Sequence, residues 1–436
     1  MLTELPLNPG AAAISDTNGI LRVYARFLGL WDGEEHAIIA NSYMYPFPGA
    51  GVNPQEAVFV PKPGDPESAF YIARMGSPFA QANYLSMGII ELKLGVSGVL
   101  PPAVVDTGFT WFMDNAKPKR MVVPHANGVD YWFVASPIGQ GQSQYHAYRI
   151  TSAGIDTPPV ISAAGPVLPA DWETGQMVPS FQGDRFASAS LKHYQDTTTA
   201  LGYLYVHGFD RSTGAVQEGF ALPDLHVIRG VEFSHSGRYL YVAEVNDLGS
   251  VSGPFRHDLY QYDLEAADVH GSRVQLNTYT FTGPYGYTTS ALAMGPDGRI
   301  YMANEVGDSL SVIRSPDLPG TLCDFVGNAL CCGTFFTLPA PAKWYHDDPG
   351  TALGTTDVAT TGIIVYPNPA HDRAWVTGLP DQARHYLLRD ATGRVVHQAG
   401  SPQNGIDLGT VAAGPYVLEI LARHGERVAT ARIMKQ

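Results

Sequence analysis

Two stretches of the chain share one pattern of apolar strand, glycine turn and second apolar strand. They are GVEFSHSGRYLYVAEV (230–245) and ALAMGPDGRIYMANEV (291–306). In each, the turn ends in Gly-Arg, and alternate residues of the following strand are aromatic or apolar. A period of two is typical of half-buried strands, and glycine suits a turn position that requires positive φ. Each stretch is therefore predicted to form a β-hairpin, with Gly237 and Gly298 in the left-handed region.

Four weaker copies of this pattern precede the clear pair. Successive turn glycines of the series are 45 to 64 residues apart, and a further strand rich in aromatic or β-branched residues follows most hairpins. Units of three or four strands at this spacing are typical of β-propeller blades, whereas a row of sandwiches needs about 100 residues per unit. The weaker copies have their turns at Gly19, Gly64, Gly128 and Gly183.

The repeats predict an all-β body over residues 1–345 that is a six- or seven-bladed β-propeller. Six units can be recognised, and a seventh can be assembled from residues 333–345 together with a strand near the N-terminus. Residues 346–362 are rich in Gly, Thr, Asp and Ala without apolar periodicity, which predicts a linker.

A shorter module with a different rhythm follows at residues 363–436. In YPNP, Pro367 and Pro369 flank Asn368 and cannot donate to a strand ladder, so the motif ends one strand before RAWVTGL begins another. HYLLRDATGRVVHQ is predicted to be a hairpin with Gly393 in the left-handed position. A bend at Gly414 and a last strand through Ile433 complete a predicted β-sandwich.

Charge separates the same two parts. The 436 residues carry a net charge of −14; the tail from Ile363 holds eight Arg and Lys against six Asp and Glu, a charge of +2, which leaves −16 for the rest. An acidic body is not expected to bind nucleic acid, because it lacks the basic surface that a phosphate backbone requires.

No apolar run reaches the roughly 20 residues of a membrane-spanning helix, so the protein is not expected to be integral to a membrane. The N-terminus lacks the charged and apolar regions of a signal peptide, and we expect a leader and a further strand upstream of Met1.

Candidate chemistry in the body is sparse. The sequence has no GxSxG, HExxH, EF-hand or phosphate-binding glycine motif, and no catalytic, cofactor-binding or metal residue is predicted. Scattered histidines and carboxylates lie near hairpins, and the sequence alone does not show whether their side chains come together in one catalytic or metal-binding centre. Exposed tryptophans stack well on sugars, and Trp111 and Trp172 lie in irregular segments. The side chains considered for convergence are His125, His207, His235, His257, Asp130, Glu232, Glu244 and Asp297.

The three cysteines lie within ten residues of each other. In an oxidising compartment Cys323 can form a disulfide with Cys331 or Cys332, which leaves one thiol over. The alternative is that all three are buried, unpaired thiols that act as small hydrophobic residues. Zinc is disfavoured because no second CxxC or His pair stands at ligand spacing.

Both parts of the chain resemble substrates of the type IX secretion system. In the body, SDTNGIL, FVPKPGDPESAFYIA, GVEFSHSGRYLYVA, GPDGRIYMA and LCDFVGN stand in the order found in a family of exported propeller proteins. The tail resembles a type A C-terminal sorting domain through YPNP, GRVV, IDLGTVAAGPYVLEI and its basic end. The residues that carry the sorting resemblance are Pro367, Asn368, Pro369, Gly393, Arg394, Val395, Gly414, Tyr416 and Lys435.

The resemblance implies an immunoglobulin-like tail that an outer-membrane translocon binds. A sortase-like peptidase then removes it and joins the cargo to surface lipopolysaccharide of a Gram-negative bacterium. The body is expected to be a non-enzymatic recognition or adhesion module for glycan or protein. The alternatives are a secreted propeller hydrolase or lyase acting on polysaccharide or lactone, and a structural component of a surface layer.

Overall fold

The chain divides into two compact units, Met1–His346 and Asp347–Gln436. The computed structural model describes residues 12–15, 21–26, 29–33, 36–39, 57–65, 69–76, 86–93, 103–104, 110–138, 141–168, 175–191, 202–247, 254–281, 291–295, 297–303, 309–331, 338, 363–379, 383–389, 395–421 and 427–436. The predicted linker at 346–362 lies outside these residues, as does the predicted seventh unit at 333–345 apart from Leu338.

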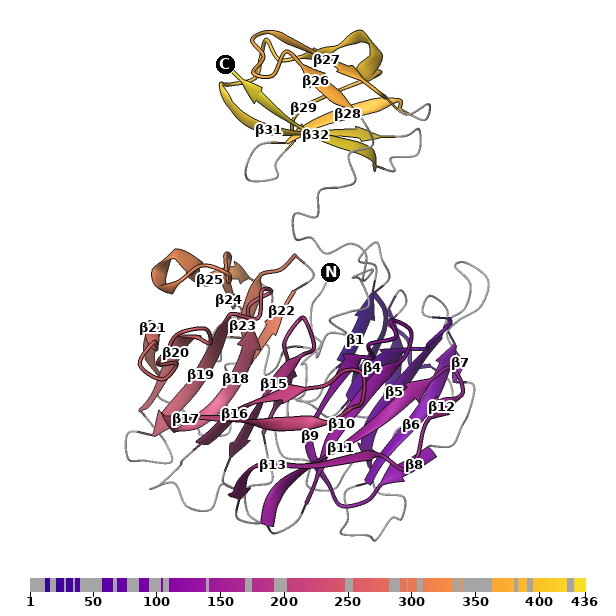
Figure 1. Cartoon of the computed structure of the whole chain (residues 1–436), viewed down its shortest axis with the longest axis vertical. Coiled ribbons are helices and arrows are strands. Elements are labelled where there is room, and N and C mark those ends of the chain that lie inside the picture. Colours follow the sequence, from indigo (N-terminus) through magenta and orange to yellow (C-terminus); the bar gives the residue numbers. More distant parts are fainter. Residues whose placement is uncertain are drawn as a thin grey trace. The chain divides into compact units, whose positions relative to one another are not determined.

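The first unit is built from antiparallel sheets, and within each sheet most strands pair with their neighbours in the chain (Figure 1). The first sheet holds β1 (Ala12–Ser15), β2 (Leu21–Arg26) and β3 (Gly29–Asp32). The second holds β4 (Ala57–Pro61), β5 (Ala69–Gly76), β6 (Ser86–Lys93), β7 (Ala103–Val104) and β8 (Thr110–Met113). The third holds β9 (Ala116–Pro124), β10 (Tyr131–Pro137), β11 (Gly141–Thr151), β12 (Gly154–Ile155) and β13 (Val160–Leu168).

Three further sheets complete the described part of this unit. The fourth holds β14 (Met177–Pro179), β15 (Arg185–Leu191), β16 (Gly202–Phe209) and β17 (Val216–Leu225). The fifth holds β18 (Val227–Phe233), β19 (Tyr239–Asp247), β20 (Phe255–Asp263) and β21 (Val274–Phe281). The sixth holds β22 (Leu292–Met294), β23 (Ile300–Ala303), β24 (Ser309–Ile313) and β25 (Phe325–Cys331), with a short 3-10 helix η3 (Gly320–Cys323) before β25.

The first strands of most successive sheets contact one another, which is the arrangement of propeller blades. Contacts join β1 to β4, β9 to β14, β14 to β18 and β18 to β22. Figure 1 shows the six sheets following one another in chain order, from indigo to orange. The predicted all-β propeller body is confirmed, whereas its number of blades, six or seven, stays a prediction.

Each hydrophobic cluster of the body lies between two consecutive sheets. Leu204 of the fourth sheet packs in one cluster with Leu240 of the fifth, and Phe186 of the fourth packs in another with Val134 of the third. The same holds for the remaining three clusters, between the first and second, second and third, and fifth and sixth sheets. Burying one such side chain is worth about 1.5–3 kcal/mol, so each sheet is stabilised by its neighbours rather than alone.

The turn glycines adopt the predicted conformation. Gly237 and Gly298, in the two clear hairpins, have φ of 75° and 74°. Gly64, Gly128 and Gly183, in the weaker copies, have φ of 82°, 73° and 69°, and Gly19 lies outside the described residues. A side chain is strained in this region, which explains why glycine recurs at this place in the repeat.

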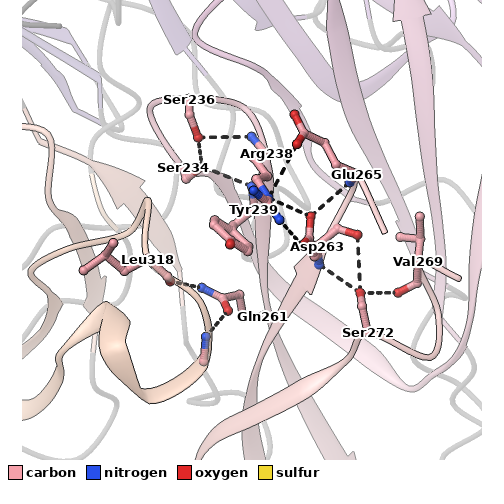
Figure 2. Close-up of polar contacts among 11 residues, drawn as sticks. Ser234, Ser236, Arg238, Tyr239, Gln261, Asp263, Glu265, Val269, Ser272 and Leu318 are labelled. Carbon is pink, nitrogen blue, oxygen red and sulfur yellow. Dashed lines mark hydrogen bonds and ion pairs between the residues drawn. The ribbon is translucent and has the colours of Figure 1, made fainter. Parts of the chain in front are cut away.

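Arg238, which follows the turn glycine of the first clear hairpin, also has a structural role. Figure 2 shows Arg238 facing Asp263 at the end of β20, and its Nε and Nη2 donate to the two carboxylate oxygens at 3.0 and 2.7 Å. Ser272 Oγ accepts a hydrogen bond from the Asp263 backbone N–H at 2.9 Å. The β18–β19 turn is therefore joined to the following hairpin by a bidentate ion pair.

The second unit is a two-layer β-sandwich. One sheet holds β26 (Ile364–Tyr366), β27 (Arg373–Thr377) and β30 (Ile406–Asp407), in that order. The other has the order β29 (Val395–Ala399), β28 (His385–Arg389), β31 (Gly414–Leu421) and β32 (Arg427–Lys435), and a 3-10 helix η4 (Pro402–Asn404) precedes β30. Its core draws on both sheets, with Ala374 and Ile406 facing Leu388, Leu418 and Ile433.

Candidate functional site

The YPNP motif forms the turn after β26 and closes against the last residues of the chain. Asn368 Oδ1 accepts a hydrogen bond from the Met434 backbone N–H at 2.8 Å. Two backbone bonds flank it, from Ala370 N–H to the Met434 carbonyl and from Gln436 N–H to the Ala370 carbonyl, both at 2.8 Å. Two predicted parts of the tail, the proline turn and the basic end, are therefore one structural element.

Gly414, Tyr416 and Lys435 belong to the same end of the sandwich. Gly414 begins β31 and pairs with Lys435 at the end of β32, while Tyr416 pairs with Ile433. The Tyr416 hydroxyl donates to the Ala412 carbonyl at 2.8 Å, which ties the bend before β31 to the strand itself. The structure thus brings these three predicted residues close to the proline turn through β32.

The remaining predicted residues of the tail lie elsewhere. Val395 begins β29 and pairs with Arg389 of β28, as the predicted hairpin requires. Gly393 and Arg394 lie outside the described residues. Sequence reasoning missed Ala370 and Met434, because they take part through backbone groups that no side-chain pattern reveals.

The comparison with family models decides what this unit is. Residues 364–436 match the model of the secretion system C-terminal sorting domain. The tail is a type IX sorting domain. The match covers the whole sandwich from β26 to the C-terminus, and a chain that carries this domain is destined for the cell surface or the exterior.

Comparisons of the whole chain give only distant likenesses. No curated protein matches it. Among solved structures, hydrazine synthase of Kuenenia stuttgartiensis is 11% identical over 71% of this chain and 78% of that one, with a TM-score of 0.40. The periplasmic gluconolactonase PpgL of Pseudomonas aeruginosa is 13% identical over 97% and 98%, with a TM-score of 0.38. Likenesses this weak say nothing about the activity of the body.

The body holds a fully buried lysine between its third and fourth sheets. Lys119 Nζ, on β9, donates to Ser190 Oγ at 2.7 Å, to Ser188 Oγ at 3.1 Å and to the Ala189 carbonyl at 3.4 Å, all on β15. Burial, together with the charge of Lys117, lowers the pKa of Lys119 to about 7. Sequence reasoning missed it, because nothing in AKPKRMVVP marks which lysine faces the next sheet.

The histidines considered for a catalytic centre have different surroundings. His207 Nε2 lies 3.1 Å from the Tyr145 hydroxyl, and burial lowers its pKa to about 4. His125 stacks on Trp132, His235 lies against Phe181 and His257 stacks on Tyr279. Burial likewise lowers the pKa of His257 to about 4. None of these contacts joins one of the four histidines to another.

The carboxylates considered for the same centre are engaged separately. Asp130 accepts from Arg149, and Asp297 accepts from the Tyr301 hydroxyl at 2.7 Å. Glu232 accepts from the backbone N–H of Phe233 at 2.9 Å and of Met294 at 3.1 Å, so it joins β18 to β22. Glu244 accepts from the His226 N–H at 2.7 Å. Within the residues that the structure describes, no group of three or more His, Cys, Asp or Glu side chains is arranged to hold a metal ion.

Two of the three cysteines are described. Cys323 is a buried, free thiol in η3, and burial raises its pKa. Cys331 ends β25, and Cys332 lies outside the described residues. The disulfide to Cys323 stays a prediction.

Two tryptophans differ in their surroundings. Trp111 of β8 is exposed, whereas Trp132 is buried and donates from Nε1 to the Arg211 carbonyl at 2.8 Å. Trp172 and Trp344 lie outside the described residues. Among the described residues, no helix is both long and apolar enough to cross a membrane.

Proposed function

We propose that the type IX translocon exports this protein by binding its sorting domain, and that a sortase-like peptidase then cuts the chain within residues 346–362. The cargo is the propeller, delivered to the outer surface of a Gram-negative bacterium after an upstream leader has taken it across the inner membrane. The observation that carries the proposal is the self-contained sandwich at 364–436, which has its own core and matches the sorting family.

Export is tested by deletion and transfer in a host that has the secretion system. With an upstream signal peptide supplied, the chain without residues 363–436 should accumulate in the periplasm, whereas the full chain reaches the surface. Residues 346–436 fused to a periplasmic reporter should carry that reporter out. Surface delivery of the deleted chain at the level of the full chain would refute the assignment.

For the body, we propose non-enzymatic recognition of a glycan or protein at the cell surface. Support comes from Trp111, an exposed indole on β8, because flat aromatic faces stack on sugar rings. The test is binding of the full chain to surface polysaccharides. Trp111→Ala should weaken binding about two- to twelvefold, the loss expected when a stacking contact worth about 0.5–1.5 kcal/mol is removed.

The matched control is Tyr203→Ala, which removes an exposed aromatic residue from a different sheet. Equal binding by the Trp111 variant and the unsubstituted chain would show that Trp111 does not contact the ligand. Release of soluble products from the polysaccharide would favour the hydrolase or lyase alternative instead.

A further inference from the structure

The last residues of the chain depend on the proline turn for their backbone hydrogen bonds. Met434 stands opposite Pro415 of β31. In a strand the N–H and C=O of one residue lie on the same side, and those of Met434 both bond to the turn, the N–H to Asn368 Oδ1 and the carbonyl to the Ala370 N–H. The end of β32 is therefore held from the turn as well as from its neighbour in the sheet.

This attachment lies at the outer edge of the sheet. β32 is the last strand in the order β29-β28-β31-β32, and Ala370 forms a parallel bridge with Lys435 along it. An edge strand has no partner strand on its outer side, so the turn supplies the contact that keeps residues 434–436 extended.

Asn368 contributes the side chain that makes this attachment specific. Its carboxamide oxygen reaches across 66 residues of sequence to the Met434 N–H. Pro367 and Pro369 on either side restrict the backbone of the turn, so the oxygen is presented with little conformational freedom. An apolar residue at 368 would leave the turn in place and remove the acceptor.

We propose that Asn368 is a positioning residue for export: it holds the C-terminal residues 434–436 in the extended form in which the translocon binds the sorting domain. The inference rests on the proposed export function. It adds that residues 434–436 are the part of the sorting domain that must be ordered for export. The YPNP motif then promotes export indirectly, by holding the C-terminal strand that the translocon binds.

The test compares three full-length variants, each with a signal peptide supplied, in a host with the secretion system. Asn368→Ala removes the acceptor oxygen, Asn368→Asp keeps one, and Gln398→Ala removes an exposed amide of β29 as a matched control. Surface delivery is measured in cells. Hydrogen exchange of the Met434 and Gln436 amides, and of the Leu388 and Leu418 amides in the core, is measured on the purified chains.

The expected result separates positioning from folding. Asn368→Ala should speed exchange at Met434 about fivefold or more, the change in opening equilibrium that one hydrogen bond controls, and should lower surface delivery relative to the unsubstituted chain. Exchange at Leu388 and Leu418 should not change. Asn368→Asp and Gln398→Ala should behave as the unsubstituted chain in both measurements.

Three results with Asn368→Ala would overturn the proposal while leaving export by the sorting domain intact. The first is full delivery of Asn368→Ala despite fast exchange at Met434. The second is unchanged exchange at Met434. The third is loss of both core protection and delivery, which would make Asn368 a residue of folding only.

A chain that ends at Ile433 should be delivered as poorly as Asn368→Ala, and its full delivery would also refute the role of residues 434–436. Delivery of a chain lacking 363–436 would instead refute the export function itself.

Discussion

Single residues in this protein show how burial changes chemistry. Lys119 is surrounded by neutral oxygens of β15 between two sheets, and water cannot stabilise its charge there. Its pKa of about 7 in the folded chain contrasts with 10.5 for an exposed lysine. Between these two values the unfolded chain binds a proton that the folded chain does not, so stability rises with pH across that interval.

Lys119 therefore predicts a pH-dependent stability of the body. Between pH 7 and 9 the free energy of unfolding should increase by about 2 kcal/mol from this group, since one pKa unit corresponds to 1.36 kcal/mol. Below pH 7 the amine is protonated in both states and the gain is absent. Urea denaturation followed by tryptophan fluorescence at pH 7, 8 and 9 measures the slope, and Lys119→Met should flatten it.

Lys62 provides the control for this measurement. Its hydrogen bond to Glu91 raises its pKa above 10.5, so it titrates outside the interval and Lys62→Met should keep the slope. An unchanged slope in Lys119→Met would contradict the prediction.

At the scale of elements, side chains of one sheet hold loops of the next. Gln261 of β20 donates from Nε2 to the Leu318 carbonyl at 2.8 Å and accepts at Oε1 from the Gly320 N–H at 2.6 Å (Figure 2). The Tyr241 hydroxyl donates to the Pro316 carbonyl at 2.8 Å in the same loop. These bonds order the segment that leads into η3, where Cys323 is buried.

The reactivity of Cys323 should report on this attachment. Gln261→Leu keeps the approximate volume of the side chain but leaves the Leu318 carbonyl and the Gly320 N–H without their partner, which costs about 1–3 kcal/mol for each group. The rate of Cys323 alkylation, measured by mass spectrometry of its peptide, should rise at least about tenfold, because 1.4 kcal/mol of local opening is a factor of ten. Gln217→Leu, on the exposed edge strand β17, should leave the rate unchanged; equal rates in both variants would contradict the role of Gln261.

At the scale of the whole molecule, each unit has a core of its own. Among the residues that the structure describes, the cluster that contains Leu418 draws on residues 363–433, and the five clusters of the body draw on residues 12–325. Each unit thus buries its own apolar surface, which is the main favourable contribution to folding. A sorting domain with its own core can fold independently of the cargo that precedes it.

Calorimetry of the full chain should show two unfolding transitions. Leu418 is fully buried, and Leu418→Ala should destabilise the sorting domain by about 2–5 kcal/mol and lower only its transition. Leu240→Ala, in the cluster between the fourth and fifth sheets, should lower only the transition of the body. Transitions that shift together in either variant would show that the two units unfold as one.

The sequence by itself determined the features that depend on neighbouring residues. Alternating apolar positions and turn glycines predicted the β18–β19 and β22–β23 hairpins, and the five described glycines have the positive φ that their turns require. The sorting domain was recognisable because its motifs, such as YPNP, are short and contiguous in the sequence. These signals are local, since a strand period and a turn conformation are properties of a few adjacent residues.

Only the tertiary structure decided which distant groups meet. Lys119 and Ser190 are 71 residues apart and Asn368 and Met434 are 66 residues apart, and in the second pair one partner is a backbone N–H. Lys117 and Lys119 look equivalent in the sequence, and both are buried on β9, yet only the fold shows that the Lys119 amine reaches the Ser188 and Ser190 hydroxyls of the next sheet. Such contacts depend on how sheets pack and on where the chain returns, which no local pattern encodes.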